Sequence, residues 1–426
     1  MTSYWCSSAW LGGEVVESVR LEVAGDVLSS VAVGPRQAED GALGGVVFPG
    51  FANAHSHAFH RALRGRTHDG GGTFWTWREL MYDVADLLDP DSYLQLARAV
   101  FAEMVLAGYT VVGEFHYLHH GPGGQRYDDG NAMGRALVQA AADAGIRLTL
   151  LDACYLQGGL DGRPLEGPQL RFGDRDVDQW AARVSDLRDG PLVKHGVAAH
   201  SVRAVPVEAL PVLGRHGIRH VHLSEQPAEN DDCLAVHGRT PTELLDDHGF
   251  LGAGACAVHA THLTGGDLVR LARTAVCMCP TTERDLADGI GPAREHRGPL
   301  CLGSDQHAVI DPFEEVRGLE MDDRLASLER GRFSPAELVT AASRGGYQAL
   351  GWDGGELRAG AVADLVAVRT DSPRTAGATP AQLHLAATSA DVTDVVVGGR
   401  HVVQAGVHAL GDVGSMTLDA LRRLTR

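Results

Sequence analysis

The chain carries two histidines, His55 and His57, directly after an apolar run that extends from Val46 to Phe51. In a β-strand, the side chains at positions i and i+2 point to the same face. Two imidazoles on one face at the end of a strand can bind one metal ion through their ring nitrogens. The pair alone is equally compatible with two ordinary surface histidines, so its interpretation depends on the rest of the chain.

Other residues of similar chemistry also follow apolar, β-branched runs. They are His222 with Glu225, His259 with His262, and Asp305 after a Gly-Ser pair. Histidines and carboxylates at the ends of successive strands are typical of active sites at the carboxyl face of a TIM barrel. The pattern therefore predicts that these residues meet at one face of a barrel.

Apolar, strand-like segments alternate with helix-like segments along most of the chain. We expect eight strands, at residues 46–54, 110–117, 147–154, 193–201, 219–225, 255–261, 275–280 and 299–305. Helices are expected at 90–107, 131–144, 177–187, 206–216 and 335–350. Alternating strands and helices form parallel βα units, and eight such units close a barrel. The predicted fold class is α/β, with a TIM-like (β/α)8 barrel over residues 46–359.

Both ends of the chain depart from this alternation. The first 45 residues have the pattern of short strands and turns, and strand-like and hairpin-like segments return after residue 360. We therefore expect residues 1–45 and 360–426 to form a small β-sandwich domain to which both chain ends contribute. Within the barrel, the connection after the first strand is long and contains Gly70–Gly72 and an aromatic run, and long βα loops are usually functional.

Composition excludes several classes of function. The net charge is −18 and the sequence has no basic stripe, which argues against nucleic acids and anionic membranes as partners. No stretch approaches the roughly 20 apolar residues of a membrane span, and no secretory signal is evident at the N-terminus. The seven scattered cysteines suit reduced thiols. We expect a cytoplasmic protein that acts on a small molecule.

Several runs carry a specific resemblance to a known family. The order His-x-His, His-x-x-Glu, His and Ser-Asp, together with the segment Ala363–Val366, resembles the amidohydrolase superfamily along essentially the whole chain. Within it, the runs 53–61, 74–82 and 113–120 are similar to the formimidoylglutamate deiminases of histidine degradation. The sequence departs from that family at His60, where the family is expected to carry Gln. The resemblance implies hydrolysis of N-formimino-L-glutamate to N-formyl-L-glutamate and ammonia, and a homodimer.

Three imidazoles and a carboxylate suit a borderline metal ion, so the residues and the resemblance together indicate one Zn²⁺ per chain, or another divalent transition metal. The expected ligands are His55, His57, His222 and Asp305. Superfamily members with two metals use a carboxylated lysine at the end of the fourth strand. Lys194 stands instead at the start of that strand, where we expect an ordinary solvated side chain. This favours one metal ion over two.

The resemblance also implies roles in proton transfer. Glu225 is expected to carry protons to the substrate nitrogen and to the departing ammonia. His259 is expected to hydrogen-bond the attacking water, and Asp305 to take a proton from it. His262 is expected to be structural.

A substrate with two carboxylates needs local positive charge, which arginine supplies through paired hydrogen bonds. Arg78, in the loop after the first barrel strand, and Arg203 are the candidates, and the resemblance adds Tyr117, His200 and His60 as further contacts. Two tryptophans near Arg78 fit either the pocket wall or the core, and three histidines of the 113–120 run are placed beside the site without a ligand role. These five residues are Trp75, Trp77, His116, His119 and His120.

Two other functions are compatible with parts of the pattern. Another deaminase of the same superfamily would act on a purine, pterin or related amidine-containing ring, which needs no pair of arginines. A metal-free barrel that serves as a binding or assembly module would need no metal ligands, and the four candidates present argue against it.

Overall fold

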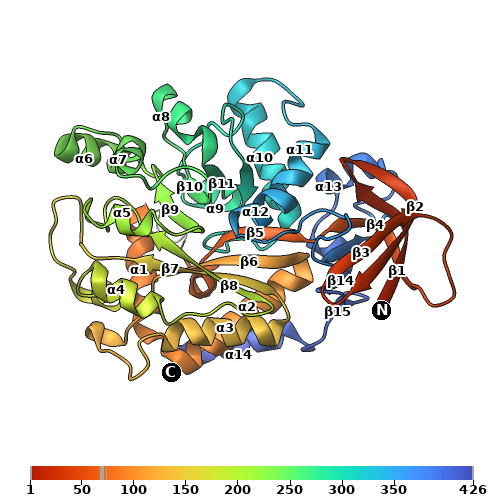
Figure 1. Cartoon of the computed structure of the whole chain (residues 1–426), viewed down its shortest axis with the longest axis horizontal. Coiled ribbons are helices and arrows are strands. Elements are labelled where there is room, and N and C mark those ends of the chain that lie inside the picture. The colour runs from red at the N-terminus through yellow and green to blue at the C-terminus, as the bar shows by residue number, and fades with distance from the viewer. Residues whose placement is uncertain (1, 68–71, 73, 425–426) are drawn as a thin grey trace.

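The computed structural model describes residues 2–67, 72 and 74–424. One of its two sheets contains eight parallel strands that follow one another in chain order around a barrel (Figure 1). They are β5 (Phe51–Ser56), β6 (Tyr109–His116), β7 (Arg147–Cys154), β8 (Val193–Ala199), β9 (Arg219–Leu223), β10 (Ala255–His259), β11 (Ala275–Met278) and β12 (Leu300–Leu302). The predicted barrel is confirmed.

The barrel closes between its last and first strands through residues at their carboxyl ends. The backbone N–H of His57 donates to the carbonyl of Asp305 at 3.1 Å, and the N–H of Asp305 donates to the carbonyl of His55 at 3.0 Å. Two positions about 250 residues apart in the sequence are therefore neighbours at one face. This closure places the candidate carboxylate beside the two candidate histidines.

Helices and connecting turns surround the barrel (Figure 1). The helices are α1 (Phe74–Leu87), α2 (Pro90–Ala107), α3 (Ala132–Ala144), α4 (Val177–Val184), α5 (Leu210–Leu213), α6 (Pro227–His237), α7 (Pro241–Asp247), α8 (Gly265–Arg270), α9 (Pro280–Asp285), α10 (Pro312–Ser327), α11 (Pro335–Thr340), α12 (Gly346–Ala349), α13 (Leu383–Ala386) and α14 (Val413–Leu424). A π-helical segment, Ala341–Gly345, joins α11 to α12.

The bounds of α2 coincide with those expected, because its ends carry clear local signals. The Asp89 side chain accepts from the backbone N–H of Ser92, and Pro90 occupies the first helical position. Gly108 ends the helix in the left-handed conformation, at φ 103°. The helix expected at 206–216 is shorter than predicted, because the structure has only α5 there, with turns on both sides.

Both chain ends build the second sheet, which also has eight strands, in the order β16-β15-β14-β13-β4-β1-β2-β3. These are β1 (Thr2–Leu11), β2 (Glu14–Ala24), β3 (Val27–Val33), β4 (Gly41–Pro49), β13 (Leu365–Val368), β14 (Val392–Val397), β15 (Arg400–Gln404) and β16 (Val407–His408). The separate β-structure expected from the chain ends is therefore present as one sheet. The helix α14 leaves it and packs against α2 (Figure 1).

The strand expected at 46–54 proves to be two strands. Residues up to Pro49 pair with β1 and β13 of the second sheet, and the barrel strand begins at Phe51. Gly50 joins the two, and a Cβ at this position would lie 2.0 Å from the Thr110 hydroxyl and 2.8 Å from that of Tyr347. Only glycine fits this crossing, and a continuous apolar pattern cannot reveal it.

A buried ion pair links the barrel to the second sheet. The Arg147 guanidinium, on β7, donates to both carboxylate oxygens of Asp364 at 2.9 and 3.2 Å. The same carboxylate accepts from the Tyr347 hydroxyl at 2.5 Å and from the backbone N–H of Gly398 at 2.7 Å. This network gives the Ala363–Val366 segment a structural function.

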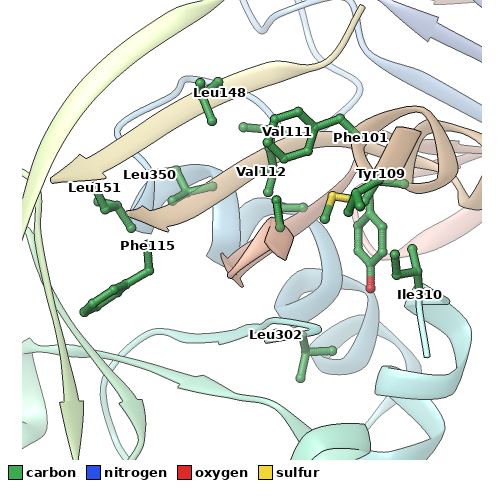
Figure 2. Packing of buried hydrophobic residues seen from close by; sticks show 14 of the residues in the cluster. Phe101, Tyr109, Val111, Val112, Phe115, Leu148, Leu151, Leu302, Ile310 and Leu350 are labelled. Carbon is green, nitrogen blue, oxygen red and sulfur yellow. The ribbon is translucent and has the colours of Figure 1, made fainter. Parts of the chain in front are cut away.

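One large apolar cluster fills the barrel and the spaces between its strands and helices. Figure 2 shows part of this cluster, with Phe101, Val111 and Leu148 among the labelled side chains. All three are fully buried. Close packing of this kind holds the strand ends rigidly, which a precisely arranged site requires.

Candidate active site

Four side chains converge at the carboxyl face of the barrel, and all are buried. His222 Nε2 lies 3.1 Å from His55 Nε2 and 3.3 Å from His57 Nε2. Asp305 Oδ1 lies 3.3 and 3.4 Å from the Nε2 atoms of His55 and His57. Ligand atoms about 2.0–2.1 Å from a central ion in a tetrahedron are roughly 3.3 Å apart. These four separations match the distance expected between ligand atoms of one metal ion.

Hydrogen bonds to backbone carbonyls define which nitrogens face this centre. His57 Nδ1 lies 2.9 Å from the carbonyl oxygen of Phe115, and His222 Nδ1 lies 2.8 Å from that of His200. A carbonyl only accepts, so both Nδ1 atoms carry the proton and both Nε2 atoms present lone pairs.

Two facing lone pairs repel each other unless something lies between them. Burial lowers the pKa of His57 to about 3 and that of His222 well below its usual range, so neither ring gains a second proton near neutral pH. A bound cation between the two Nε2 atoms removes the repulsion. The donor set therefore fits a metal ion.

Backbone strain is concentrated at the same strand ends. Ser224, His259 and Asp305 are not glycines, yet their φ angles are 49°, 66° and 43°. The left-handed region is unfavourable for such residues, and strained conformations of this kind cluster at functional sites. The strain is compensated by the packed barrel beneath it.

A carboxylate and an imidazole lie next to the metal-type donor set. Glu225 Oε1 is 3.7 Å from His259 Nε2, which is also 3.7 Å from Asp305 Oδ2. Burial raises the pKa of Glu225 to about 7, close to the value that suits proton transfer at neutral pH. Burial disfavours a charged His259, but Glu225 and Glu283 together raise its pKa well above the usual value.

Glu283 is a residue of the site that sequence reasoning missed. Its Oε1 accepts from the backbone N–H of Cys279 at 2.7 Å and lies 3.4 Å from Nδ1 of His259. The carboxylate thereby orients the imidazole from the side opposite Glu225. The available signal was its position in a short helix directly after a predicted strand end, at 275–280.

All five predicted substrate contacts line one cavity together with Glu225 and three of the four metal-type donors, His57, His222 and Asp305. The five contacts are His60, Arg78, Tyr117, His200 and Arg203. Further lining residues were not predicted, and Tyr155, which follows the end of β7, is the one that the strand-end pattern could have indicated. Arg78 belongs to helix α1 and not to a loop, because the aromatic run that contains it is helical.

His60 is placed to influence both the metal-type donors and the cavity. Its Nε2 lies 2.7 Å from the Tyr117 hydroxyl, and its ring centroid is 4.5 Å from that of His57. Its Nδ1 is buried, and no partner for it is found in the described part of the chain. His60, where the sequence is expected to depart from the family pattern, thus lies in the cavity wall.

Trp77 lines the cavity, which answers one question that the sequence left open. The Trp75 side chain lies outside the described residues. His262 Nε2 donates to the carbonyl of Asp288 at 2.7 Å, as suits a structural role. Lys194 is at the start of β8 as expected and is half-buried, with its ammonium group donating to the carbonyl of Gly351 and lying 5.0 Å from the centre of the Trp352 ring.

The histidine-rich segment at the end of β6 contains a second group of side chains whose types could bind a metal ion. Ligand atoms of His116, His119 and Asp152 approach one another within 4.8 Å. The Asp152 carboxylate is, however, already bound by Arg183 at 2.6 and 2.9 Å and by the Trp180 indole at 3.1 Å. The Arg183 guanidinium therefore compensates the charge of the Asp152 carboxylate.

Comparison with known proteins places this fold and site in a defined class. The sequence pattern of the amidohydrolase family matches residues 46–402. The chain belongs to the amidohydrolase family.

Among its relatives, it is 37% identical to the formimidoylglutamate deiminase of Pseudomonas aeruginosa, over 96% of both chains. It is 30% identical to an 8-oxoguanine deaminase of the same species, over 86% of this chain and 84% of that one. Among solved structures, an amidohydrolase from Brucella melitensis matches with a TM-score of 0.93 and 32% identity, over the whole of both chains. No helix in the described ranges is long and apolar enough to cross a bilayer.

Proposed function

We propose that this protein hydrolyses N-formimino-L-glutamate to N-formyl-L-glutamate and ammonia, a step of histidine degradation. The observation that carries the proposal is that Arg78 and Arg203 line the same cavity as His57, His222 and Asp305, which belong to the buried donor set. Similarity to the Pseudomonas deiminase over 96% of the chain supports it.

The two arginines would bind the two substrate carboxylates. A chain of net charge −18 repels a dianion unless positive charge is gathered locally, and guanidinium groups do so with paired hydrogen bonds. Tyr117 and His200 line the same cavity, with ring centroids 5.2 Å from that of His57 and 5.0 Å from that of His222, and His60 lies beside Tyr117. The formimino group would then lie toward Glu225.

His55, His57, His222 and Asp305 would hold one zinc ion per chain. When bound, such an ion supplies Lewis-acid chemistry that makes water a nucleophile at neutral pH. A second ion would need a lysine at the carboxyl end of β8, and Lys194 lies at the opposite end of that strand.

The remaining chemistry belongs to side chains of this protein. The water oxygen adds to the formimino carbon while Asp305 accepts a proton from the water. His259 hydrogen-bonds the attacking oxygen. Glu225, with its raised pKa, protonates the terminal nitrogen. The bond from carbon to that nitrogen then breaks while the added oxygen gives its remaining proton to the Glu225 carboxylate, so that ammonia leaves and the formyl group remains on the glutamate nitrogen. The proton held by Asp305 passes to the departing ammonia, which is released as ammonium.

Ammonia release from a panel of compounds tests the proposal. The panel contains N-formimino-L-glutamate, N-formimino-L-aspartate, guanine, 8-oxoguanine and cytosine. We expect the highest kcat/KM for N-formimino-L-glutamate. A higher value for a neutral ring would contradict the proposal and would favour the heterocycle deaminases, to which the chain is also similar.

We further propose a cytoplasmic homodimer with a small β-domain made of residues 1–45 and 360–426. The seven cysteines are buried and free, as suits a reducing compartment. Light scattering on the purified protein measures the oligomeric state directly, and a monomer at micromolar concentration would contradict the dimer.

A further inference from the structure

A single buried carboxylate connects the substrate side of the cavity to the proton-transfer side. Glu229, in the first turn of α6, is 3% exposed and lies outside the set of described residues that line the cavity. Its Oε2 accepts from Arg203 Nε at 2.7 Å, and its Oε1 accepts from the backbone N–H of Ser224 at 2.9 Å. Sequence reasoning assigned this residue no role.

The bond to Ser224 supports the strained turn of the site. Ser224 lies between His222 and Glu225 and has a φ of 49°. Its N–H is held by Glu229, and its carbonyl accepts from the N–H of His262 at 3.0 Å. These two bonds fix the direction in which the chain presents Glu225 to the cavity.

The bond to Arg203 determines which donors the arginine offers. A guanidinium has five N–H groups, and here Nε–H is committed to Glu229. The atoms left for a ligand are the two Nη groups, whose parallel N–H bonds match the two oxygens of a carboxylate. Arg203 therefore presents its terminal edge to a ligand, and Glu229 sets the orientation of that edge.

We propose that Glu229 is a positioning residue that aligns Arg203 for a substrate carboxylate and, with its other oxygen, aligns the turn that carries Glu225. The inference rests on the proposed function, because it requires a substrate that bears a carboxylate. One rigid carboxylate then holds the carboxylate-binding edge at a constant separation from the proton-transfer group. This separation selects substrates whose carboxylate and amidine are a matching number of bonds apart.

A double-mutant cycle between Glu229→Gln and Arg203→Met tests the proposal. The glutamine side chain has one acceptor for two donors, so it leaves either Arg203 or the Ser224 N–H without a partner. We expect kcat/KM for N-formimino-L-glutamate to fall roughly tenfold. In the Arg203→Met protein, the glutamine oxygen at position 229 has only the Ser224 N–H to accept from. Glu229→Gln should therefore change kcat/KM of that protein less than about twofold.

Asp231→Asn is the matched control, because it removes one carboxylate from an exposed position of the same helix. Its kcat/KM should equal that of the unaltered protein. Equal losses from Glu229→Gln in both backgrounds would overturn the proposal, since a residue that only supports the fold acts independently of Arg203.

Urea unfolding of the same four proteins gives a readout that needs no substrate. Glu229→Gln should lower the unfolding midpoint when Arg203 is present. In the Arg203→Met protein it should leave the midpoint unchanged or raise it, because it neutralises a buried carboxylate that has lost its cation. Equal shifts in both backgrounds would overturn the proposal. If the unaltered protein releases no ammonia from N-formimino-L-glutamate, the proposed function fails, while this unfolding cycle still decides the role of Glu229.

Discussion

Glu225 and His259 face each other across 3.7 Å, and each is almost fully buried at the cavity wall. The residues come from different strand ends, and each changes the proton affinity of the other. The shared environment holds the Glu225 pKa at about 7, so this side chain can both accept and donate a proton near neutral pH.

Replacement of Glu225 by Gln should therefore abolish turnover without disturbing the donor set. The amide has nearly the same shape but cannot carry a proton, so kcat should fall at least about 100-fold. Steady-state ammonia release and metal analysis of the purified variant measure the two effects. The exposed Glu208 provides a control, because Glu208→Gln should leave kcat unchanged. Normal turnover by the Glu225 variant would assign proton transfer to another group.

The donor set predicts about one zinc ion per chain. His55→Ala and Asp305→Ala should each lose the metal together with activity, as measured by elemental analysis. His262→Ala should retain it, because its imidazole is bonded to the Asp288 carbonyl and lies outside the donor set. Stoichiometric metal in a protein with both His55 and His57 replaced by Ala would refute the assignment, and two ions per chain would refute the argument from Lys194.

The arginines predict a loss of substrate affinity that depends on the substrate. Arg78→Met or Arg203→Met should raise KM for N-formimino-L-glutamate while the metal content stays constant. Loss of a charge-assisted hydrogen bond costs roughly 1.5–3 kcal/mol, or about 10- to 150-fold in kcat/KM. Lysine should restore only part of the affinity, because a point charge cannot form the paired hydrogen bonds.

An analogue that lacks the matching carboxylate distinguishes binding from folding. The loss in kcat/KM from each arginine substitution should disappear with that analogue, because the arginine then has no substrate carboxylate to bind. Arg188→Met, at an exposed position, controls for the change in net charge. Equal losses with the full substrate and the analogue would show that the arginines stabilise the fold.

Arg183 predicts a large effect on stability at a site remote from the chemistry. Its guanidinium binds the buried carboxylates of Asp152 and Asp174 at 2.6 and 2.9 Å. Arg183→Met should lower the free energy of unfolding by about 3–5 kcal/mol, because it leaves buried charge uncompensated. Urea denaturation measures this value. Arg175→Met, which breaks an exposed pair with Asp176, should leave the free energy of unfolding nearly unchanged.

The same network predicts how stability depends on pH. Burial alone would raise the pKa of Asp174, but His120 and Arg183 lower it below its usual value of 3.8. A lowered pKa in the folded state stabilises the protein above pH 3.8, and this contribution is lost as the pH falls below it. The free energy of unfolding should decrease by about 1.4 kcal/mol per pH unit for this group. In Asp174→Asn, the slope of the unfolding free energy against pH should be smaller by the contribution of one titrating proton. An unchanged slope would show that another group causes the acid sensitivity.

Much of the fold and of the site could be predicted because the signals are local or follow from parallel topology. The spacing of His55 and His57 places both on one face of a strand whatever the rest of the chain does. Parallel strands bring their carboxyl ends to one side, so His222 and Asp305 had to lie near them once a barrel was predicted. The division of the strand at 46–54 was missed, because both parts are equally apolar.

Glu229 and Glu283 could not be found in the same way. Each is one glutamate in a short helix that follows a strand end, and such residues are usually solvated. Their importance comes from what lies opposite them, which is Arg203 in one case and His259 in the other. A contact between distant segments leaves no periodic trace in a single sequence.

The amino-acid sequence by itself determined the types of side chain, their order along the chain and the barrel that gathers them, because hydrophobic periodicity and strand alternation are properties of short segments. Only the tertiary structure decided that two imidazole nitrogens lie 3.3 Å apart with their lone pairs facing, and that the pKa of Glu225 is about 7. Both depend on barrel closure and on the depth of burial, which many distant residues produce together.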